Sequence, residues 1–182
     1  MIEASAPARA GVIGNPTDGY GGSLISCTVD CRATVRITGA ERIELAFGGQ
    51  ETVITDETGL RLDGGFFDIA KSVIRYLRIA DKGFRIEGTS DVPYRSGLAG
   101  STAMLAAVYG AVSSFLGMET NRYQLAETIR YIELNYMDIQ CGYQDQYMTV
   151  FGGLNYMDFR TKEVYVDIED EVYATIEPLA DV

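Results

Sequence analysis

The chain has 182 residues, a formal net charge of −11 and no histidine. The acidic balance argues against nucleic acid as a partner, because a phosphate backbone is bound by a basic surface. The lack of histidine excludes Ser-His-Asp and Cys-His catalysis, so any chemistry is expected to use carboxylates, arginine, hydroxyls and an oxygen-bound metal such as magnesium. No apolar run reaches the roughly 18 residues of a membrane span, and the N-terminus lacks a secretory pattern, so we expect a cytoplasmic protein.

The first part of the chain is predicted to be mostly β-structure. Residues 4–14 predict a short strand, and the alternating β-branched and polar residues of 23–37 predict a longer one. Between them, Gly14 to Gly22 are nearly all turn-forming residues, which predicts a loop. Shorter strands are predicted at 42–47 and 51–55, with a further candidate at 60–62.

Helices are predicted in the middle of the chain. Apolar residues at helical spacing predict a helix over 68–79, and a strand over 84–89 follows it. A buried helix from Ala103 to about Leu116 and a helix capped by Asn121 come next. The remaining elements are a short helix at 142–151 and strands at 153–159, 162–168 and 172–177. This order predicts an α+β domain with a mixed or antiparallel sheet packed against helices, rather than repeated βαβ units.

The stretch from Pro93 to Ala103, PYRSGLAGSTA, lies between a predicted strand and the buried helix. Its glycines and hydroxyls, placed directly ahead of a helix, form a concave loop of backbone N–H groups. The positive end of the helix dipole points into such a loop, which makes a phosphate the natural ligand. A simple Gly/Ser helix cap is the alternative.

Four charged residues are further candidates. Arg9 and Asp18 flank the glycine turn, where an aspartate can accept hydrogen bonds from ligand hydroxyls or simply form an Asx turn. Glu133 lies on an apolar helix and needs a partner or a metal if it is buried, whereas at the surface it needs neither. Asp145 opens a short helix, as a cap or as a catalytic base. Together with the phosphate loop, these residues are the parts of a phosphoryl-transfer site.

These motifs resemble those of the GHMP kinases, which include galactokinase, homoserine kinase, mevalonate kinase and phosphomevalonate kinase. The stretch 93–103 resembles the family's P-x-x-x-G-L-[GS]-S-S-A phosphate loop, and residues 6–22 are similar to its first motif. Residues 142–153 resemble the segment with the catalytic aspartate, and Glu133 precedes Asp145 by the expected dozen or so residues. The resemblance implies the family's N-terminal α+β fold, also found in a domain of ribosomal protein S5.

Departures from these motifs indicate which members of the family the chain resembles most. Asn15 and Pro16 replace the Glu-His of the galactokinase pattern, and the stretches 10–22 and 97–103 look most like those of glucuronokinase. That resemblance implies transfer of the γ-phosphoryl group of ATP to the anomeric hydroxyl of a sugar or uronic acid. Another sugar or heptose, a non-sugar alcohol and a catalytically silent binding module of the same fold stay open as alternatives.

The resemblance also implies roles for single residues on the substrate side. Asp145 would orient and deprotonate, or electrostatically assist, the acceptor hydroxyl, and Arg9 would neutralise the charge that develops on the transferred phosphoryl group. Asp18, with Gly21 and Gly22 of the glycine turn, would hold the hydroxyls of the sugar.

On the nucleotide side, the resemblance implies ATP and Mg²⁺ as cofactors. Ser101 and Glu133 would bind the metal. The phosphates of ATP would contact Arg95, Ser96, Gly97, Leu98, Ala99, Gly100, Ser101 and Thr102.

Family members continue for more than a hundred further residues into a second domain. We therefore expect residues 1–182 to be the N-terminal, ATP- and Mg²⁺-binding domain, with the C-terminal domain absent from this chain or supplied by a partner chain. The expected partners are ATP and a small sugar-type substrate, without nucleic acid or membrane, and a homodimer stays open. Alone, this portion is expected to turn over little substrate.

Overall fold

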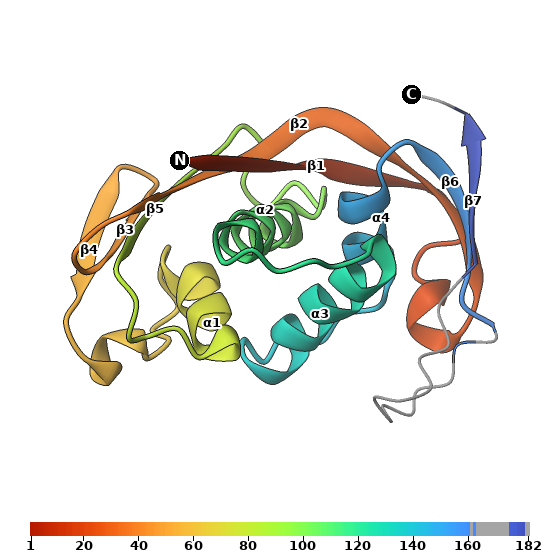
Figure 1. Cartoon of the computed structure of the whole chain (residues 1–182). Coiled ribbons are helices and arrows are strands. Elements are labelled where there is room, and N and C mark those ends of the chain that lie inside the picture. The colour runs from red at the N-terminus through yellow and green to blue at the C-terminus, as the bar shows by residue number, and fades with distance from the viewer. Residues whose placement is uncertain (161, 163–174, 181–182) are drawn as a thin grey trace.

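A single sheet arches over the helices of this protein, as Figure 1 shows for a computed structural model that describes residues 1–160, 162 and 175–180. The sheet order is β4-β3-β5-β2-β6-β7, and β1 pairs with β2. The strands are β1 (Ile2–Ile13), β2 (Ser23–Gly39), β3 (Ile43–Phe47), β4 (Gln50–Ile54), β5 (Phe84–Ser90), β6 (Leu154–Asp158) and β7 (Thr175–Ala180). Only the β3–β5 pair among these is parallel, so the sheet is mixed.

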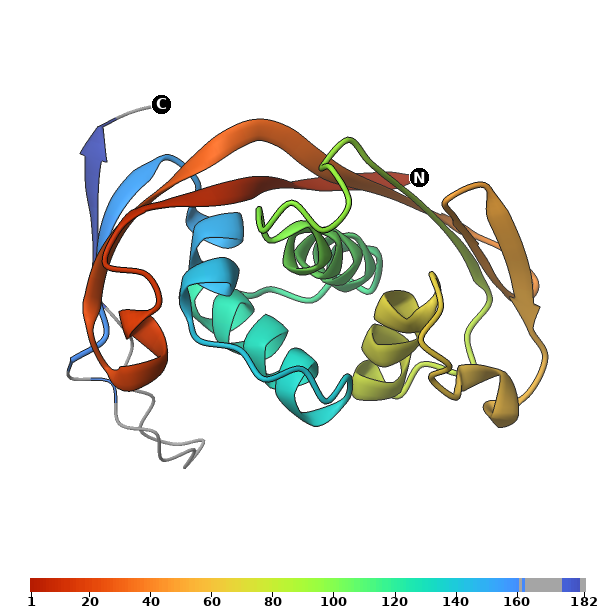
Figure 2. The same cartoon turned by 180° about the vertical axis from the view of Figure 1, so that it is seen from behind.

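The helices lie together under the arch, and both views agree on this arrangement (Figures 1 and 2). They are α1 (Asp68–Leu77), α2 (Gly100–Phe115), α3 (Arg122–Asn135) and α4 (Gln144–Phe151), with short 3₁₀ helices η1 (Thr17–Tyr20) and η2 (Glu57–Leu60). Helix α2 packs against β1 and β2 and contacts the other three α-helices. It is apolar on nearly all sides because it is enclosed by its neighbours.

The long strand β2 connects the two ends of the sheet. Its second half pairs with β5 and its first half with β6, while β1 runs along its other edge. The inward-facing residues Ala33, Val35 and Ile37 are fully buried and form part of the main core with the helices. A second, smaller core forms around Tyr147 of α4 and Phe159.

The predicted α+β class and mixed sheet are confirmed, as are the strands predicted at 42–47 and 51–55. Asn121 caps α3 as predicted, within a capping box completed by Gln124. The strand proposed at 60–62 is wrong. Residues 57–60 form η2, because the Asp56 carboxylate accepts hydrogen bonds from the backbone N–H groups of Thr58 and Gly59 and closes a tight turn there.

The end of the chain can be compared only in part. The strand predicted at 153–159 is observed as β6. The strand predicted at 162–168 falls, apart from Lys162, outside the described residues, and that predicted at 172–177 overlaps β7 only from Thr175 onward. Within the described part of the chain, no helix has the length and apolar character needed to cross a membrane.

Candidate active site

The glycine-rich loop between β5 and α2 has the backbone of an anion cradle. Arg95, Gly97 and Ala99 have positive φ angles of 56°, 74° and 58°, and α2 begins at the next residue, Gly100. Left-handed residues at alternate positions curl the chain so that successive N–H groups face one concave side. The N–H groups of the first turn of α2 have no intrahelical acceptor. The loop therefore offers a run of donors at the positive end of a helix.

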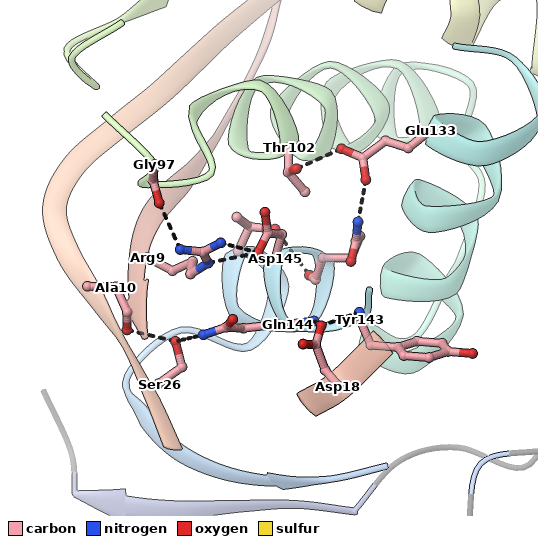
Figure 3. A network of polar contacts seen from close by, with 12 residues as sticks. Arg9, Ala10, Asp18, Ser26, Gly97, Thr102, Glu133, Tyr143, Gln144 and Asp145 are labelled. Carbon is pink, nitrogen blue, oxygen red and sulfur yellow. Dashed lines mark hydrogen bonds and ion pairs between the residues drawn. The ribbon is translucent and has the colours of Figure 1, made fainter. Parts of the chain in front are cut away.

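Arg9 on β1 connects this loop to the predicted catalytic aspartate (Figure 3). Its backbone N–H donates to the Leu98 carbonyl at 3.0 Å, and its Nη1 donates to the Gly97 carbonyl at 2.9 Å. Its Nε donates to Asp145 Oδ1 at 2.8 Å, and its Nη2 donates to the same oxygen. The Arg9 side chain is 11% exposed and that of Asp145 is 32% exposed. The two predicted catalytic residues thus meet beside the loop, with the carboxylate accessible to a ligand.

Asp18 holds the start of α4, the helix that carries Asp145. Its Oδ2 accepts hydrogen bonds from the backbone N–H groups of Tyr143 at 2.7 Å and Gln144 at 2.9 Å. Because Asp18 is only 5% exposed, these contacts make it the anchor of the helix N-terminus. Its predicted contact with sugar hydroxyls stays a prediction.

Gln144 ties the same turn to the sheet. Its Nε2 donates to Ser26 Oγ at 3.0 Å, and Ser26 Oγ donates to the Ala10 carbonyl at 2.8 Å, next to Arg9 in β1. Gln144 and Ser26 are both buried. This buried chain of hydrogen bonds fixes α4 and β1 relative to each other, and therefore the Arg9–Asp145 pair.

Glu133 on α3 lies behind this pair and is 2% exposed. Thr102 Oγ1 donates to its Oε1 at 2.6 Å, and Gln146 Nε2 donates to its Oε2. Burial raises the pKa of Glu133, and the negative charge of Asp145 adds to that rise, while hydrogen bonds from Thr102, Gln146 and the Cys141 thiol oppose it. A divalent cation would offset both unfavourable effects.

The oxygen ligands available at Glu133 and its neighbours suit Mg²⁺. The resemblance assigned Ser101 and Glu133 to the metal. The structure brings Thr102 to the Glu133 carboxylate and leaves Ser101 exposed on the same turn of α2, so the metal contact of Ser101 stays a prediction. Among the residues that the structure describes, no three or more Cys, Asp or Glu gather closely enough to hold a metal alone. Mg²⁺ usually binds through one or two carboxylates plus substrate phosphates, which matches a carboxylate and a hydroxyl beside the loop.

Cys141, which lies beside Glu133, is not an activated nucleophile. Cys27, Cys31 and Cys141 are all free thiols. Burial, followed by the charge of Glu133, raises the pKa of Cys141 to about 12. At neutral pH this thiol is therefore almost wholly protonated, and it is the thiolate that reacts.

Gly21 and Gly22 follow η1 at the start of β2. Gly21 has a φ of 71° and ends η1, and a side-chain carbon at Gly22 would lie 2.4 Å from that of Thr17. Both glycines are thus required by the turn itself, and their predicted substrate contacts stay a prediction. A separate cleft of about 1120 Å³ between β4, η2 and α1 contains none of the predicted site residues.

Four residues of the site were not predicted in these roles. Thr102 was assigned only to phosphate, and Ser26, Gln144 and Gln146 were not singled out. The one available signal was the sequence Gln-Asp-Gln at a helix start, where amide side chains on both sides of a candidate base have hydrogen bonds to satisfy.

Comparisons with known proteins agree on one family. Residues 67–153 match the family model of the GHMP kinases N terminal domain. The chain is 30% identical to D-glycero-alpha-D-manno-heptose 7-phosphate kinase of Campylobacter jejuni, over 91% of this chain and 53% of that protein. It is 26% identical to galactokinase of Thermotoga maritima, over 94% of this chain and 51% of that protein. The chain thus spans about half the length of these curated relatives.

A solved structure supports the same assignment. The crystal structure of a D-glycero-D-manno-heptose 1-phosphate kinase from Bacteroides thetaiotaomicron superposes with a TM-score of 0.85 at 27% identity. The match covers 99% of this chain and 60% of that one. The similarity therefore extends over nearly the whole of the present chain.

Proposed function

Because the chain belongs to the GHMP kinase superfamily and matches its N-terminal domain, we propose that the protein transfers the γ-phosphoryl group of ATP to a hydroxyl of a sugar. The observation that carries the proposal is the Arg9–Asp145 ion pair beside the glycine-rich loop, with Glu133 close enough to feel the charge of Asp145. An accessible carboxylate, a cationic side chain and a cradle of N–H groups together meet the needs of phosphoryl transfer.

Asp145 would act on the acceptor hydroxyl. Both hydrogen bonds from Arg9 go to Oδ1, and Oδ2 has no hydrogen-bond partner among the described residues. Oδ2 would accept the hydroxyl proton as the sugar oxygen forms its bond to the γ-phosphorus. The bond from that phosphorus to the bridging oxygen breaks, ADP leaves, and Asp145 later gives the proton to solvent.

Arg9 and the loop would manage the negative charge. Residues 95–102 would hold the phosphates through backbone N–H groups, and Arg9, which is bonded to the Gly97 carbonyl, would stabilise charge on the transferred group. Glu133 with the hydroxyl of Thr102 or Ser101 would hold Mg²⁺. When bound, Mg²⁺ supplies charge neutralisation at the phosphate oxygens.

The acceptor class is the finer part of the proposal. The two heptose kinases and the galactokinase act, by their names, on sugars, which supports a sugar acceptor for this protein. The anomeric hydroxyl of a sugar or uronic acid, predicted from the glucuronokinase-like motifs, is the position we propose. This position and the identity of the sugar are separate from the proposed kinase activity and are tested separately.

The test measures ADP release with Mg²⁺-ATP and a panel of acceptors, using the product of the whole gene as well as this chain. The panel holds galactose, glucuronic acid, a heptose 7-phosphate and mevalonate, and ³¹P NMR of the product locates the new phosphate. We expect Asp145→Asn to lower turnover by about 100-fold or more. Asp63→Asn is the matched control, because Asp63 also pairs with a cation, Lys71, but lies by α1.

Each outcome addresses a different part of the proposal. Release of ADP with mevalonate and with none of the sugars would contradict the sugar acceptor but keep the kinase. A phosphate on a non-anomeric oxygen would contradict only the position. Full activity of Asp145→Asn would contradict the role of Asp145.

A further inference from the structure

We propose that Gln146 is a positioning residue for the cation site, which holds the Glu133 carboxylate in place and offers its own carbonyl oxygen to a water molecule bound to the cation. This inference rests on the proposed function, because it concerns the metal that phosphoryl transfer requires.

The first observation is that Glu133 is held at both oxygens. Thr102 donates to Oε1 from α2, and Gln146 donates to Oε2 from α4. A carboxylate fixed from two elements cannot rotate freely, so its orientation is set before a ligand arrives. Substituting such supporting residues typically weakens metal binding or activity by about 10- to 100-fold.

The second observation is an acceptor without a donor. Gln146 is fully buried, and its Oε1 has no hydrogen-bond partner among the described residues. Buried amide oxygens are nearly always paired, and an exception points to a water molecule or ion at that position. The two atoms of one amide are only about 2.2 Å apart, so a donor bound to Oε1 would lie within a few ångströms of the Glu133 carboxylate.

The orientation of the amide follows from the same chemistry. Turned the other way, Oε1 would face Glu133 Oε2, and two acceptors would repel each other. The donor of the amide would then be the buried atom without a partner. Only the observed orientation pairs a donor with the carboxylate and leaves an oxygen, which can accept a hydrogen bond, as the atom without a partner.

The residue also lies at a suitable place in the chain. Gln146 directly follows Asp145, so the same turn of α4 presents the proposed base and the support of the proposed metal ligand. Gln144, on the other side of Asp145, is also buried, but its side chain donates to Ser26, whereas that of Gln146 donates to Glu133. The two glutamines therefore form a matched pair, of which only one serves the cation.

The experiment measures binding of Mn²⁺ in the presence of ADP by electron paramagnetic resonance, which needs no turnover. The unsubstituted protein is compared with Gln146→Met and with Asn155→Leu, which removes another buried amide, one that donates to the Gly152 carbonyl and not to a residue of the proposed site. We expect Gln146→Met to weaken Mn²⁺ binding by about 10-fold or more, in the range seen for supporting residues at metal sites. Asn155→Leu is expected to stay within about two-fold, and ADP affinity in EDTA is expected to be alike in all three proteins.

A second measurement uses the unsubstituted protein and so does not depend on a variant folding. The side-chain amide NMR signals of Gln146 are expected to shift when Mg²⁺ and ADP are added, and those of Gln144 to shift much less. Equal Mn²⁺ affinities for the unsubstituted protein and Gln146→Met, or unmoved Gln146 signals, would overturn the inference alone. Failure of the unsubstituted protein to bind Mn²⁺ with ADP would overturn the proposed function and this inference with it.

Discussion

Replacing Gly142 by alanine is expected to detach the start of α4 from Asp18. A Cβ atom at Gly142 would lie 2.0 Å from Asp18 Oδ2 and 2.7 Å from its Cγ, whereas real Cβ contacts are essentially never below 3.0 Å. Asp18 would have to move by at least about 1 Å. Such a movement away from α4 stretches its bonds to Tyr143 and Gln144, now 2.7 and 2.9 Å, beyond hydrogen-bonding distance.

The cost follows from what those two bonds do. Each joins a backbone N–H to a charged carboxylate, and such a bond contributes about 1.5–3 kcal/mol. Partial relaxation keeps some of this energy, so we expect the free energy of unfolding to fall by about 3 kcal/mol. With a urea m-value of about 2 kcal/mol/M for a domain of this size, the unfolding midpoint would fall by about 1.5 M.

The assay is urea unfolding followed by circular dichroism, with two comparisons. Gly19→Ala, in η1 next to Asp18, is the matched control, because nothing lies within 4 Å of the added carbon. Asp18→Ala removes the atoms in the clash, so alanine at 142 should cost much less in that background than alone. A midpoint for Gly142→Ala equal to that of Gly19→Ala, or the same cost with and without Asp18, would refute this reasoning.

Four further outcomes are expected. Gly97→Ala should lower the free energy of unfolding in urea by about 1 kcal/mol, because φ is 74° and the space around the added carbon is empty, so only backbone strain acts. Thr102→Val should cost about 2 kcal/mol in the same assay, because Glu133 Oε1 loses its donor, and Thr102→Ser should restore most of this loss. Asn121→Ala should cost about 1 kcal/mol through loss of the α3 cap, with less helical signal by circular dichroism at intermediate urea. Burial raises the pKa of Tyr109, so the folded state keeps this hydroxyl protonated more strongly than the unfolded state does. The resulting contribution to the free energy of unfolding is complete below the ordinary tyrosine pKa of about 10 and is lost as the pH rises through the pKa of the folded protein. Between pH 10 and 12 the guanidinium chloride midpoint should therefore fall more steeply for the unsubstituted protein than for Tyr109→Phe.

The sequence predicted a helix or strand well where the residues that form the local pattern are also the ones that stabilise the element. The alternation in 23–37 follows from one buried face of β2, on which Val35 and Ile37 are fully enclosed. Asn121 could be identified as a cap because capping depends on neighbours in sequence. The strand predicted at 60–62 was wrong because the apolar residues there were given more weight than a local turn signal. That signal is Asp56 followed by Thr58 and Gly59.

The candidate site could be predicted only as separate parts. Arg9 and Asp145 are 136 residues apart, and no local pattern states that one pairs with the other. The resemblance to a family supplied the residues but not the contacts. That Thr102, and not the adjacent Ser101, donates to Glu133 depends on which face of α2 turns toward α3, and adjacent hydroxyls in a sequence do not settle that.

The contacts that hold the site together meet at the first turn of α4 and not at the phosphate loop. Tyr143 and Gln144 are bonded to Asp18 of η1, Gln144 also to Ser26 of β2, Asp145 to Arg9 of β1, and Gln146 to Glu133 of α3. Four elements, three of them far earlier in the chain and one, α3, directly before α4, therefore converge on this short segment, and each contact is buried or partly buried. These contacts together set the position of Asp145. We therefore expect a substitution to lower the activity most where the residue contacts this turn, whether or not it lies near the phosphate loop.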